Sequence, residues 1–373
     1  MIYFDNAATT KPCKKAMDMF NKINTEEYYN PSAPYSCAFN LSQQINNVRR
    51  EIIGCLHGDK ISDQIIFTSG ATESNNLAIL GSAKDKQKKY LFSAGEHPAV
   101  YNTAMELKSR GYDVYFIPLN KNGQIDYEKF ESMLDNDVAF VSIMFVNNET
   151  GAINNLLQIR KLLDKHCKNV VFHVDAVQGF GKIDIDVKKC KINLLSMSAH
   201  KIEGIKGIGA LYISNGTKIK NINYGGGQEF TLRSGTVNPA GIMSFYEAIK
   251  EQFSNQKENF DKVKTLKKYF IENITTNTPK ATLVTNDDNS PYIVSLFFEG
   301  FRGETIMRQL DSKGICIGTG SACSSSKVGN RVLENMGYNK SQIIGAIRIS
   351  FSHLNTISEI DQLILELKEI INH

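Results

Sequence analysis

The stretch Gln64-Ile-Ile-Phe-Thr-Ser-Gly-Ala-Thr-Glu-Ser-Asn-Asn-Leu-Ala-Ile-Leu-Gly81 places an apolar run directly before a segment with helical periodicity. Residues 64–67 predict a strand, residues 72–81 predict a helix, and only small residues join them. The alternation continues, with strands expected at 90–93, 113–117, 138–144, 170–174, 192–197 and 210–213, and helices at 98–110, 127–134 and around 156–163. Such alternation predicts an α/β fold whose large domain is a mostly parallel, doubly wound sheet.

The pattern changes after residue 238. Residues 239–274 predict one long helix and residues 275–291 a polar segment. Beyond them we expect strands at 292–298 and 347–351, helices at 304–311 and 358–371, and a Gly/Ser-rich loop at 318–326. We therefore expect a small α+β domain over 251–373 that carries this loop, a large α/β domain over 26–250, and an N-terminal segment, 1–25, that joins the small domain.

The composition is that of an ordinary soluble protein, with 42% hydrophobic and 22% charged residues in 373. Basic and acidic residues are interleaved and the net charge is +4, so no nucleic-acid partner is expected. The longest strongly apolar run, 138–146, is far shorter than the roughly 20 residues of a membrane-spanning helix, and the N-terminus lacks a secretory signal pattern. The seven cysteines form no CxxC pair, which fits a reducing cytoplasm, and the seven histidines show no metal-ligand spacing. We therefore predict a cytoplasmic protein without a membrane partner or a metal site.

The junction of the first strand and helix can bind an anion. Backbone N–H groups at a helix N-terminus, together with the Thr72 hydroxyl, suit a phosphate. Taken alone, the segment is explained at least as well by a Thr N-cap, with Glu73 stabilising the helix dipole.

Two charged residues directly follow apolar strands. Asp175 is placed to enter the ligand crevice and pair with a cationic ring nitrogen or a metal, or else to form a helix cap or a structural ion pair. Lys201 precedes three glycines, which suits a partly desolvated amine that forms a Schiff base, although a surface lysine beside a loop is the alternative. Ser198 and His200 lie beside it and can donate to an anion.

Three further residues carry possible chemistry. Cys323 lies among small residues in the Gly/Ser-rich loop, where its thiol could reach a ligand or be incidental. Arg348 is a charge inside an apolar strand and needs a partner, either a substrate carboxylate or a structural acid. Asn30 begins a turn that could bring an amide to a ligand. A phosphate site, an Asp for a ring nitrogen, a Lys for an aldehyde and an Arg for a carboxylate together predict pyridoxal 5'-phosphate acting on an amino acid.

At these residues the sequence resembles the cysteine desulfurases (NifS/IscS-like), within the class V aminotransferase group of fold-type I pyridoxal-phosphate enzymes. The shared motifs are Tyr3–Thr10, Phe67–Asn76, Glu96–His97, Val146–Gly151, His173–Gln178, Ser198–Lys201, Gly225–Glu229, Arg233–Thr236, Gly320–Cys323 and Ile347–Ser350. They span nearly the whole chain in one order. The resemblance therefore implies a fold-type I transferase, and the Gly-Ser-Ala-Cys motif is specific to its cysteine-lyase branch.

The resemblance also implies residue roles. Lys201 holds the cofactor and moves the Cα proton, His97 stacks on the ring and moves protons, and the Cys323 thiolate attacks the sulfur of L-cysteine, which yields a persulfide and L-alanine. The implied cofactor-binding residues are Ala71, Thr72, Ser198 and His200 at the phosphate, Asp175 at the ring nitrogen, Gln178 at the phenolic oxygen, Asn148, and Thr236 at the phosphate of a neighbouring subunit. The implied substrate-binding residues are Asn30, Asn148 and Arg348.

The implied partners are a second copy in a homodimer and a sulfur acceptor, either an iron–sulfur scaffold or a thiolation enzyme. Two features depart from the family pattern. Ile202-Glu203-Gly204-Ile205 replaces an aromatic residue followed by Gly-Pro, and we expect a modest effect on cofactor affinity or acceptor choice. The chain also ends directly after the last expected helix, where housekeeping relatives carry a scaffold-docking segment, so a specialised role in nitrogenase-type cluster supply or tRNA thiolation is an alternative.

Competing functions remain open at this level. A selenocysteine lyase would release selenide without attack by Cys323. Another class V β-lyase or an aminotransferase would use Lys201 and Asp175 but leave Cys323 without a task. A non-catalytic sulfur-relay protein would not need to retain Lys201, Asp175 and His97.

Overall fold

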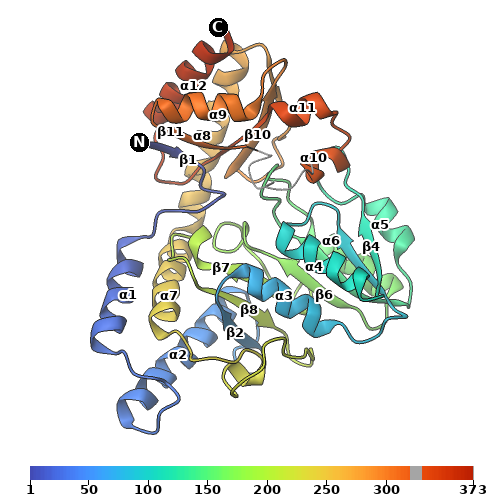
Figure 1. Cartoon of the computed structure of the whole chain (residues 1–373), viewed down its shortest axis with the longest axis vertical. Helices are drawn as coiled ribbons and strands as arrows, with labels where there is room; N and C mark the ends of the chain where they lie inside the picture. The colour runs from blue at the N-terminus through green and yellow to red at the C-terminus, as the bar shows by residue number, and fades with distance from the viewer. Residues whose placement is uncertain (320–329, 373) are drawn as a thin grey trace.

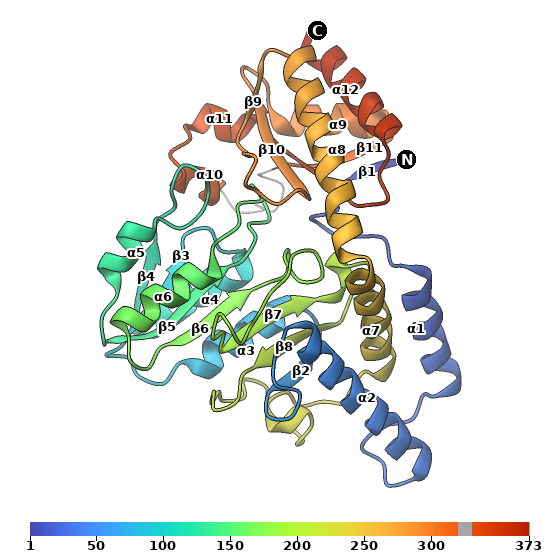
Figure 2. The same cartoon turned by 180° about the vertical axis from the view of Figure 1, so that it is seen from behind.

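A computed structural model describes residues 1–319 and 330–372, whose elements surround two sheets (Figures 1 and 2). In the described chain the large sheet has seven strands in the order β2 (Gln64–Thr68), β8 (Gly209–Ile213), β7 (Leu194–Ser198), β6 (Val171–Asp175), β5 (Val138–Met144), β3 (Lys89–Ser93) and β4 (Asp113–Ile117). Among these strands β8 alone runs opposite to the other six, so its pairings with β2 and β7 are antiparallel and the remaining pairings are parallel. The mostly parallel sheet expected from the sequence is therefore confirmed.

Helices cover both faces of the large sheet. Successive side chains of a strand point to opposite faces, and the apolar ones on each face pack against helices. Ile66 belongs to an apolar cluster with buried residues of α3 (Ala71–Ser82) and α4 (Pro98–Ser109). Ile65 and Phe67 belong to a second cluster, the large-sheet core, on the other face. That core includes residues of α2 (Ser36–Cys55), α5 (Tyr127–Met133), α6 (Leu156–His166) and α7 (Pro239–Ser254). The doubly wound arrangement follows from these two clusters.

The small sheet contains strands from both ends of the chain. In the described residues its order is β1 (Ile2–Phe4), β11 (Ile315–Thr319), β12 (Ala346–Ser350), β10 (Ile293–Phe298) and β9 (Ala281–Leu283). An apolar cluster joins it to α8 (Gln256–Asn277), α9 (Gly303–Ser312) and α12 (Ile357–Asn372). β1 pairs in parallel with β11, whereas α1 (Lys14–Glu26) packs along α7. Residues 5–10 therefore pass from the small sheet to the large one, and the domain limits at residues 25 and 250 stay a prediction.

Two short helices connect the last strands. They are α10 (Arg331–Asn335) and α11 (Lys340–Gly345). Val332 and Leu333 of α10, with Met336 just after it, belong to the large-sheet core and not to the cluster around the small sheet. Figure 1 shows α10 between the two sheets, below α11.

The structure corrects two details of the C-terminal prediction. The single helix expected over 239–274 is interrupted at Asn255, whose side chain donates to the Glu251 carbonyl at 3.1 Å. A side chain that competes for backbone hydrogen bonds in this way disfavours a continuous helix. The polar segment 275–291 also contains the three-residue edge strand β9. Among the described residues, no helix has the length and apolar character needed to cross a membrane.

Candidate active site

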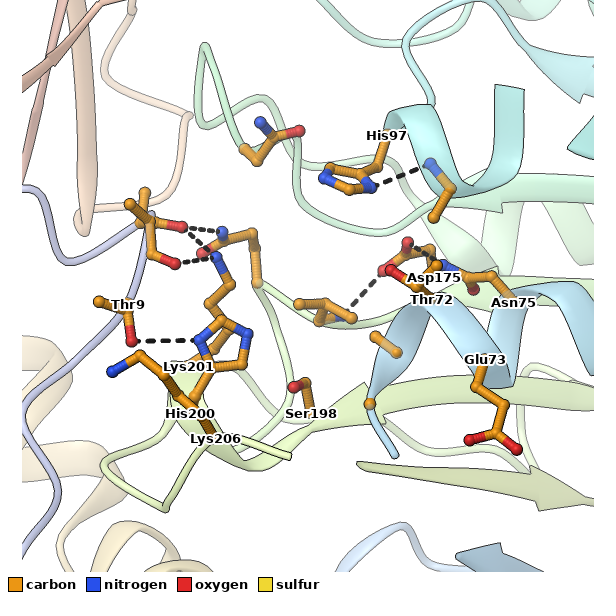
Figure 3. A pocket seen from close by; sticks show the side chains of 18 of the residues that line it. Thr9, Thr72, Glu73, Asn75, His97, Asp175, Ser198, His200, Lys201 and Lys206 are labelled. Carbon is orange, nitrogen blue, oxygen red and sulfur yellow. Dashed lines mark hydrogen bonds between the residues drawn. The ribbon is translucent and has the colours of Figure 1, made fainter. Parts of the chain in front are cut away.

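A cavity of about 660 Å³ opens at the carboxyl ends of the parallel strands, where open α/β sheets bind ligands (Figure 3). It is lined by residues from several distant segments: Ala7–Thr9, Ser69–Glu73, Asn75, His97, Ala99, Met144, Asn148, Asp175, Val177, Gln178, Ser198, His200, Lys201, Lys206, Gly207 and Arg348. Figure 3 shows Lys201 and His200 on one side, Asp175 and Thr72 on the other, and His97 above them.

The N-terminus of α3 forms one wall of the cavity. Strand β2 ends at Thr68 and α3 begins at Ala71, so the helix points its first N–H groups into the cavity edge, where they have no intrahelical acceptor. Gly209 allows this turn to lie close to β8, because a Cβ there would stand 2.7 Å from the carbonyl carbon of Gly70. The arrangement suits a bound anion.

Glu73, the acid in the first turn of α3, is bound by other groups and so interferes little with anion binding. Glu73 accepts hydrogen bonds from the Ser69 N–H at 2.6 Å and from Arg233 Nε at 2.9 Å. Burial acts to raise the pKa of Glu73, but the hydrogen bonds from Arg233 and Ser69 lower it below its ordinary value. With its charge bound by these donors, Glu73 opposes an anion at the helix terminus less than a free carboxylate would.

Asp175 is a buried carboxylate at the end of β6. One of its oxygens accepts from the Asn75 side chain at 2.8 Å and the other from the Val177 N–H at 3.0 Å. Both of these donors are neutral groups, and the carboxylate is only 2% exposed. A buried carboxylate with neutral partners is well suited to a cationic ligand atom.

Lys201 belongs to η1 (Ala199–Lys201), a single turn that directly follows β7. Its Nζ donates to the carbonyls of Ala7 and Ala8 at 2.5 and 2.7 Å. Gln178 Nε2 donates to the same Ala7 carbonyl at 2.9 Å. The segment that passes between the sheets thus holds the amine at the cavity edge, which agrees with the prediction of an amine in a partly desolvated site.

His97 caps α4 with its ring, because Nδ1 accepts from the Ala99 N–H at 3.1 Å. A neutral ring in this arrangement carries its proton on Nε2. Burial lowers the pKa of His97, and the positive charges of Lys201 and Arg331 lower it further, whereas Asp175 raises it. The imidazole is therefore neutral near pH 7 and can take up a proton.

His200 is neutral for similar reasons. Burial, followed by the charges of Lys201, Lys206 and Lys182, lowers the pKa of His200 to about 4. Its Nδ1 lies 3.2 Å from Thr9 Oγ1. At neutral pH His200 can therefore contribute a hydrogen bond, but not a positive charge, to an anion.

Arg348 reaches the cavity from β12 of the small sheet. Its Nη2 binds Asp5 Oδ1 at 2.7 Å and its Nη1 donates to the Asn148 carbonyl at 2.9 Å. Its Nε is buried and makes no hydrogen bond among the described residues. The structural acid considered as an alternative partner is therefore present as Asp5, while the guanidinium still lines the cavity.

Two described site residues, Asn30 and Thr236, do not line this cavity, and a third predicted residue lies outside the described part of the chain. Asn30 is exposed, and its side-chain oxygen accepts from the Ser32 N–H at 3.0 Å, so the turn is present. Thr236 is exposed, and the resemblance assigns it to the site of a neighbouring subunit. Cys323 lies outside the described residues. The roles of all three stay predictions.

Sequence reasoning assigned no role to several cavity residues. Ala7, Ala8 and Thr9 lie in a shared motif, but nothing in their residue types indicates that the carbonyls of Ala7 and Ala8 hold a lysine 194 and 193 positions away. Asn75 had a usable signal: it follows Thr72 by three positions, and side chains three apart share one helix face.

The donor set fits pyridoxal 5'-phosphate. The α3 terminus with Thr72, Ser198 and His200 suits a phosphate, the buried Asp175 suits a ring nitrogen, and the Lys201 amine suits an aldehyde. Asn75 Oδ1 is buried beside Asp175 and makes no hydrogen bond in the part of the chain that the structure describes.

Known proteins resemble the chain over nearly its full length. The family model of the class-V aminotransferases matches residues 2–363. The cysteine desulfurase IscS of Clostridium botulinum is 37% identical over 377 residues, which cover 99% of this chain and 94% of the relative. A solved NifS-like protein matches with a TM-score of 0.93 and 31% identity and covers 100% of this chain and 99% of its own. SspA, solved in complex with cysteine, matches with a TM-score of 0.82 and 29% identity, over 95% of this chain and all of its own.

Proposed function

The chain belongs to the class-V aminotransferase family, and on this premise we propose that it is a cysteine desulfurase. It removes sulfur from L-cysteine, releases L-alanine and retains the sulfur as a persulfide on Cys323. The observation that carries the proposal is the single cavity in which the Lys201 amine, the Asp175 carboxylate and the N-terminus of α3 face one another. The Lys201 amine in this cavity and the Cys323 thiol of the Gly-Ser-Ala-Cys motif are the two reactive groups that the proposed reaction needs.

Pyridoxal 5'-phosphate, when bound, supplies an aldehyde for amines and an electron-withdrawing ring that stabilises negative charge at the Cα of an amino acid. Lys201 would bind the aldehyde, Asp175 the ring nitrogen and Gln178 the phenolic oxygen. The N–H of Ala71 and the side chains of Thr72, Ser198 and His200 would bind the phosphate, with Thr236 of a second copy. Their shared position around the cavity supports these assignments, except that of Thr236.

The substrate carboxylate would bind Arg348, which already holds an acid, Asp5, at 2.7 Å. L-cysteine would thus take over some of the hydrogen bonds that Asp5 now receives, and Asn148 would bind beside it. Asn30 would have to approach from another part of the assembly, because it is exposed and does not line the cavity in this chain.

Two groups can move protons. The Lys201 amine would take the Cα proton once it leaves the carbonyls of Ala7 and Ala8. His97 is neutral near pH 7, because burial lowers its pKa, and would accept the substrate thiol proton. The Cys323 thiolate would then attack the substrate sulfur. An S–S bond forms as the C–S bond breaks, and the carbon that loses sulfur takes up a proton to become the methyl group of alanine.

The proposal extends to the oligomeric state, the compartment and the sulfur acceptor. The chain would act as a homodimer, in the cytoplasm, and pass its persulfide sulfur to a scaffold or thiolation enzyme. A selenocysteine lyase or another β-lyase is the alternative that the following test separates.

The test measures products of the protein loaded with pyridoxal 5'-phosphate, given L-cysteine and a thiol reductant. We expect equimolar alanine and sulfide from the wild type, loss of both products in Cys323→Ala, and full activity in Cys37→Ala, whose thiol lies on α2 outside the cavity. Pyruvate with ammonia, or full activity in Cys323→Ala, would contradict the proposal. Selenide release by Cys323→Ala from selenocysteine would favour the selenocysteine lyase.

A further inference from the structure

The residues on either side of the undescribed segment belong to different parts of the molecule. Thr319, the last described residue before it, ends β11 in the small sheet. Asn330, the first described residue after it, caps α10 by accepting from the Leu333 N–H at 3.1 Å. The buried Val332 and Leu333 of α10 pack into the large-sheet core. That core also includes Phe297 and Ala346 of the small sheet, so α10 packs where the two sheets meet.

Arg331 makes this attachment specific. Its two terminal nitrogens donate separately to the carbonyls of Ala94 and Glu96, in the turn between β3 and α4. Its guanidinium also lies 3.9 Å from the centre of the Tyr101 ring on α4. The fork of an arginine can hold two acceptors at once, and its flat face stacks on aromatic rings. Arg331 thus contacts the chain on both sides of His97.

Its neighbour Asn330 makes a second contact, with a residue adjacent to the cavity wall. The Asn330 side chain donates to Glu149 Oε2, next in sequence to the cavity residue Asn148. Burial raises the pKa of Glu149, while Arg348, Asn330 and Arg331 act to lower it. Asn330 and Arg331 therefore bind two segments, each of which carries a cavity-lining residue next in sequence, Asn148 in one and His97 in the other.

The turn held by Arg331 has another fixed point. Glu96 is 1% exposed, and its Oε1 accepts from the N–H of Met144, the last residue of β5, at 2.6 Å. The Ala94–His97 turn is thus tied to β5 from inside and to Arg331 from outside. With two such ties, the backbone that presents the His97 ring has little freedom.

The charges that act on the pKa of His97 are those of Asp175 from β6, Lys201 from η1 and Arg331 from α10. Burial and the Asp175 charge raise the pKa of Glu96, the residue before His97, well above its ordinary value, which favours the neutral form of this carboxyl. Both cationic neighbours, Lys201 and Arg331, disfavour protonation of the imidazole, and Arg331 does so from outside the cavity.

From these contacts we propose that Arg331 is a positioning residue for the reaction. It fixes the turn that presents His97 to helix α10, so that the imidazole keeps its position in the cavity. The inference rests on the proposed function, since His97 and Cys323 act together only in sulfur removal. Arg331 does not line the cavity, so its effect is transmitted through the turn.

The experiment compares Arg331→Ala, Arg331→Lys and the matched control Arg308→Ala, an exposed arginine on α9 paired with Glu304. Alanine formation by each holoenzyme is measured against L-cysteine concentration and pH. We expect kcat of Arg331→Ala to fall by about 10- to 100-fold, because misplacing a catalytic group by about 1 Å has effects of this size. KM and cofactor absorbance should match the wild type, since Arg331 contacts neither ligand site.

The pH profile separates positioning from general loss of structure. Without the positive charge the pKa of His97 rises, so the acid limb of kcat/KM in Arg331→Ala should move to higher pH. Arg331→Lys keeps the charge but not the fork, so its acid limb should stay in place while kcat falls by a smaller factor. Arg308→Ala should match the wild type in both readouts.

Other outcomes would overturn the inference. If Arg331→Ala keeps wild-type kcat and pH profile, Arg331 does not position His97. If it instead loses bound cofactor, or if its acid limb stays in place while all rates fall, its role is structural only. A wild type that makes no alanine contradicts the proposed function itself, which is a separate result.

Discussion

Two buried groups of charges in this molecule are arranged in opposite ways. Beside β2, Arg49 and Glu229 form a two-pronged ion pair with N–O distances of 2.6 and 2.8 Å. Glu229 also accepts from the Phe67 N–H at 2.8 Å, and Arg49 donates to the Ile65 carbonyl. This pair ties α2 and the Glu229–Thr231 turn to the strand, and its two opposite charges are matched to each other.

Two charged groups of the cavity, Asp175 and Lys201, are instead kept apart. Asp175 is held by an amide and a backbone N–H, and Lys201 by two carbonyls, on opposite sides of the space (Figure 3). Burial holds His97 and His200 in their neutral forms by lowering the pKa of each. Buried charges that are matched to one another thus hold elements of the fold together, whereas charges held by neutral groups remain available to a ligand.

The largest effect is expected from removing one of the separated charges of the cavity, the Lys201 amine. Replacing Lys201 with Ala removes the proposed proton-transfer group, so alanine formation should fall by about 10²- to 10⁴-fold. Steady-state assays and the loss of the covalent cofactor absorbance measure this. Lys15→Ala, which breaks an exposed ion pair with Glu251 at 2.7 Å, should leave both unchanged. Wild-type turnover in Lys201→Ala would refute the role of the amine.

The next effect breaks the matched pair. Glu229→Ala leaves the Arg49 charge buried without its carboxylate, which should lower the free energy of unfolding by about 3–5 kcal/mol. Denaturant unfolding measures it. The double variant Arg49→Met/Glu229→Leu removes both charges and should recover most of the loss. If the double variant is less stable than Glu229→Ala, the cost does not come from an unmatched charge.

A third buried group of charges, Glu203, Lys182 and His353, should make the stability of the protein depend on pH. Burial raises the pKa of Glu203 to about 7 and lowers that of Lys182 to about 7, and the Glu203 carboxylate lies 3.3 Å from His353 Nδ1. Because the pKa of Glu203 is higher in the folded than in the unfolded chain, the unfolded chain releases this proton first as pH rises. The free energy of unfolding therefore falls between about pH 4.5 and 7.

Glu203→Gln removes this titration. Its stability relative to the wild type should therefore increase between pH 5 and pH 7.5, by up to about 3 kcal/mol. Thermal unfolding of both proteins across this range gives the difference. Glu26→Gln, an exposed site at the end of α1, serves as the control and should show no trend. A difference that is constant with pH would show that Glu203 does not titrate in this range.

The smallest effect concerns the turn beside the matched pair. Glu229, Phe230 and Thr231 have φ values of 47°, 56° and 67°, in the left-handed region that disfavours branched side chains. Thr231→Gly should relieve this strain and raise stability by up to about 1 kcal/mol. Thr217→Gly, at a position outside that region, should lower stability slightly. If both changes destabilise equally, the turn stores no relievable strain.

Much of the fold and part of the site could be predicted from sequence. The strand–helix alternation predicts the large sheet because helix and strand periods are local properties. Asp175, Lys201 and Thr72 were found because each follows a strand, and the carboxyl ends of parallel strands meet at one edge. The interruption at Asn255 and strand β9 were missed because both depend on weak local preferences that tertiary packing decides.

The sequence by itself thus determined the parallel sheet, the residue types at its ligand edge and the resemblance to an enzyme family. Only the tertiary structure decided that the carbonyls of Ala7 and Ala8 hold Lys201, that Asp5 holds Arg348, and that α10 packs into the large-sheet core. It alone brought Arg331 to the turn before His97, across 235 positions of the chain. Periodicity reports only on neighbours within a few residues, whereas these contacts exist because two sheets pack on opposite sides of one cavity.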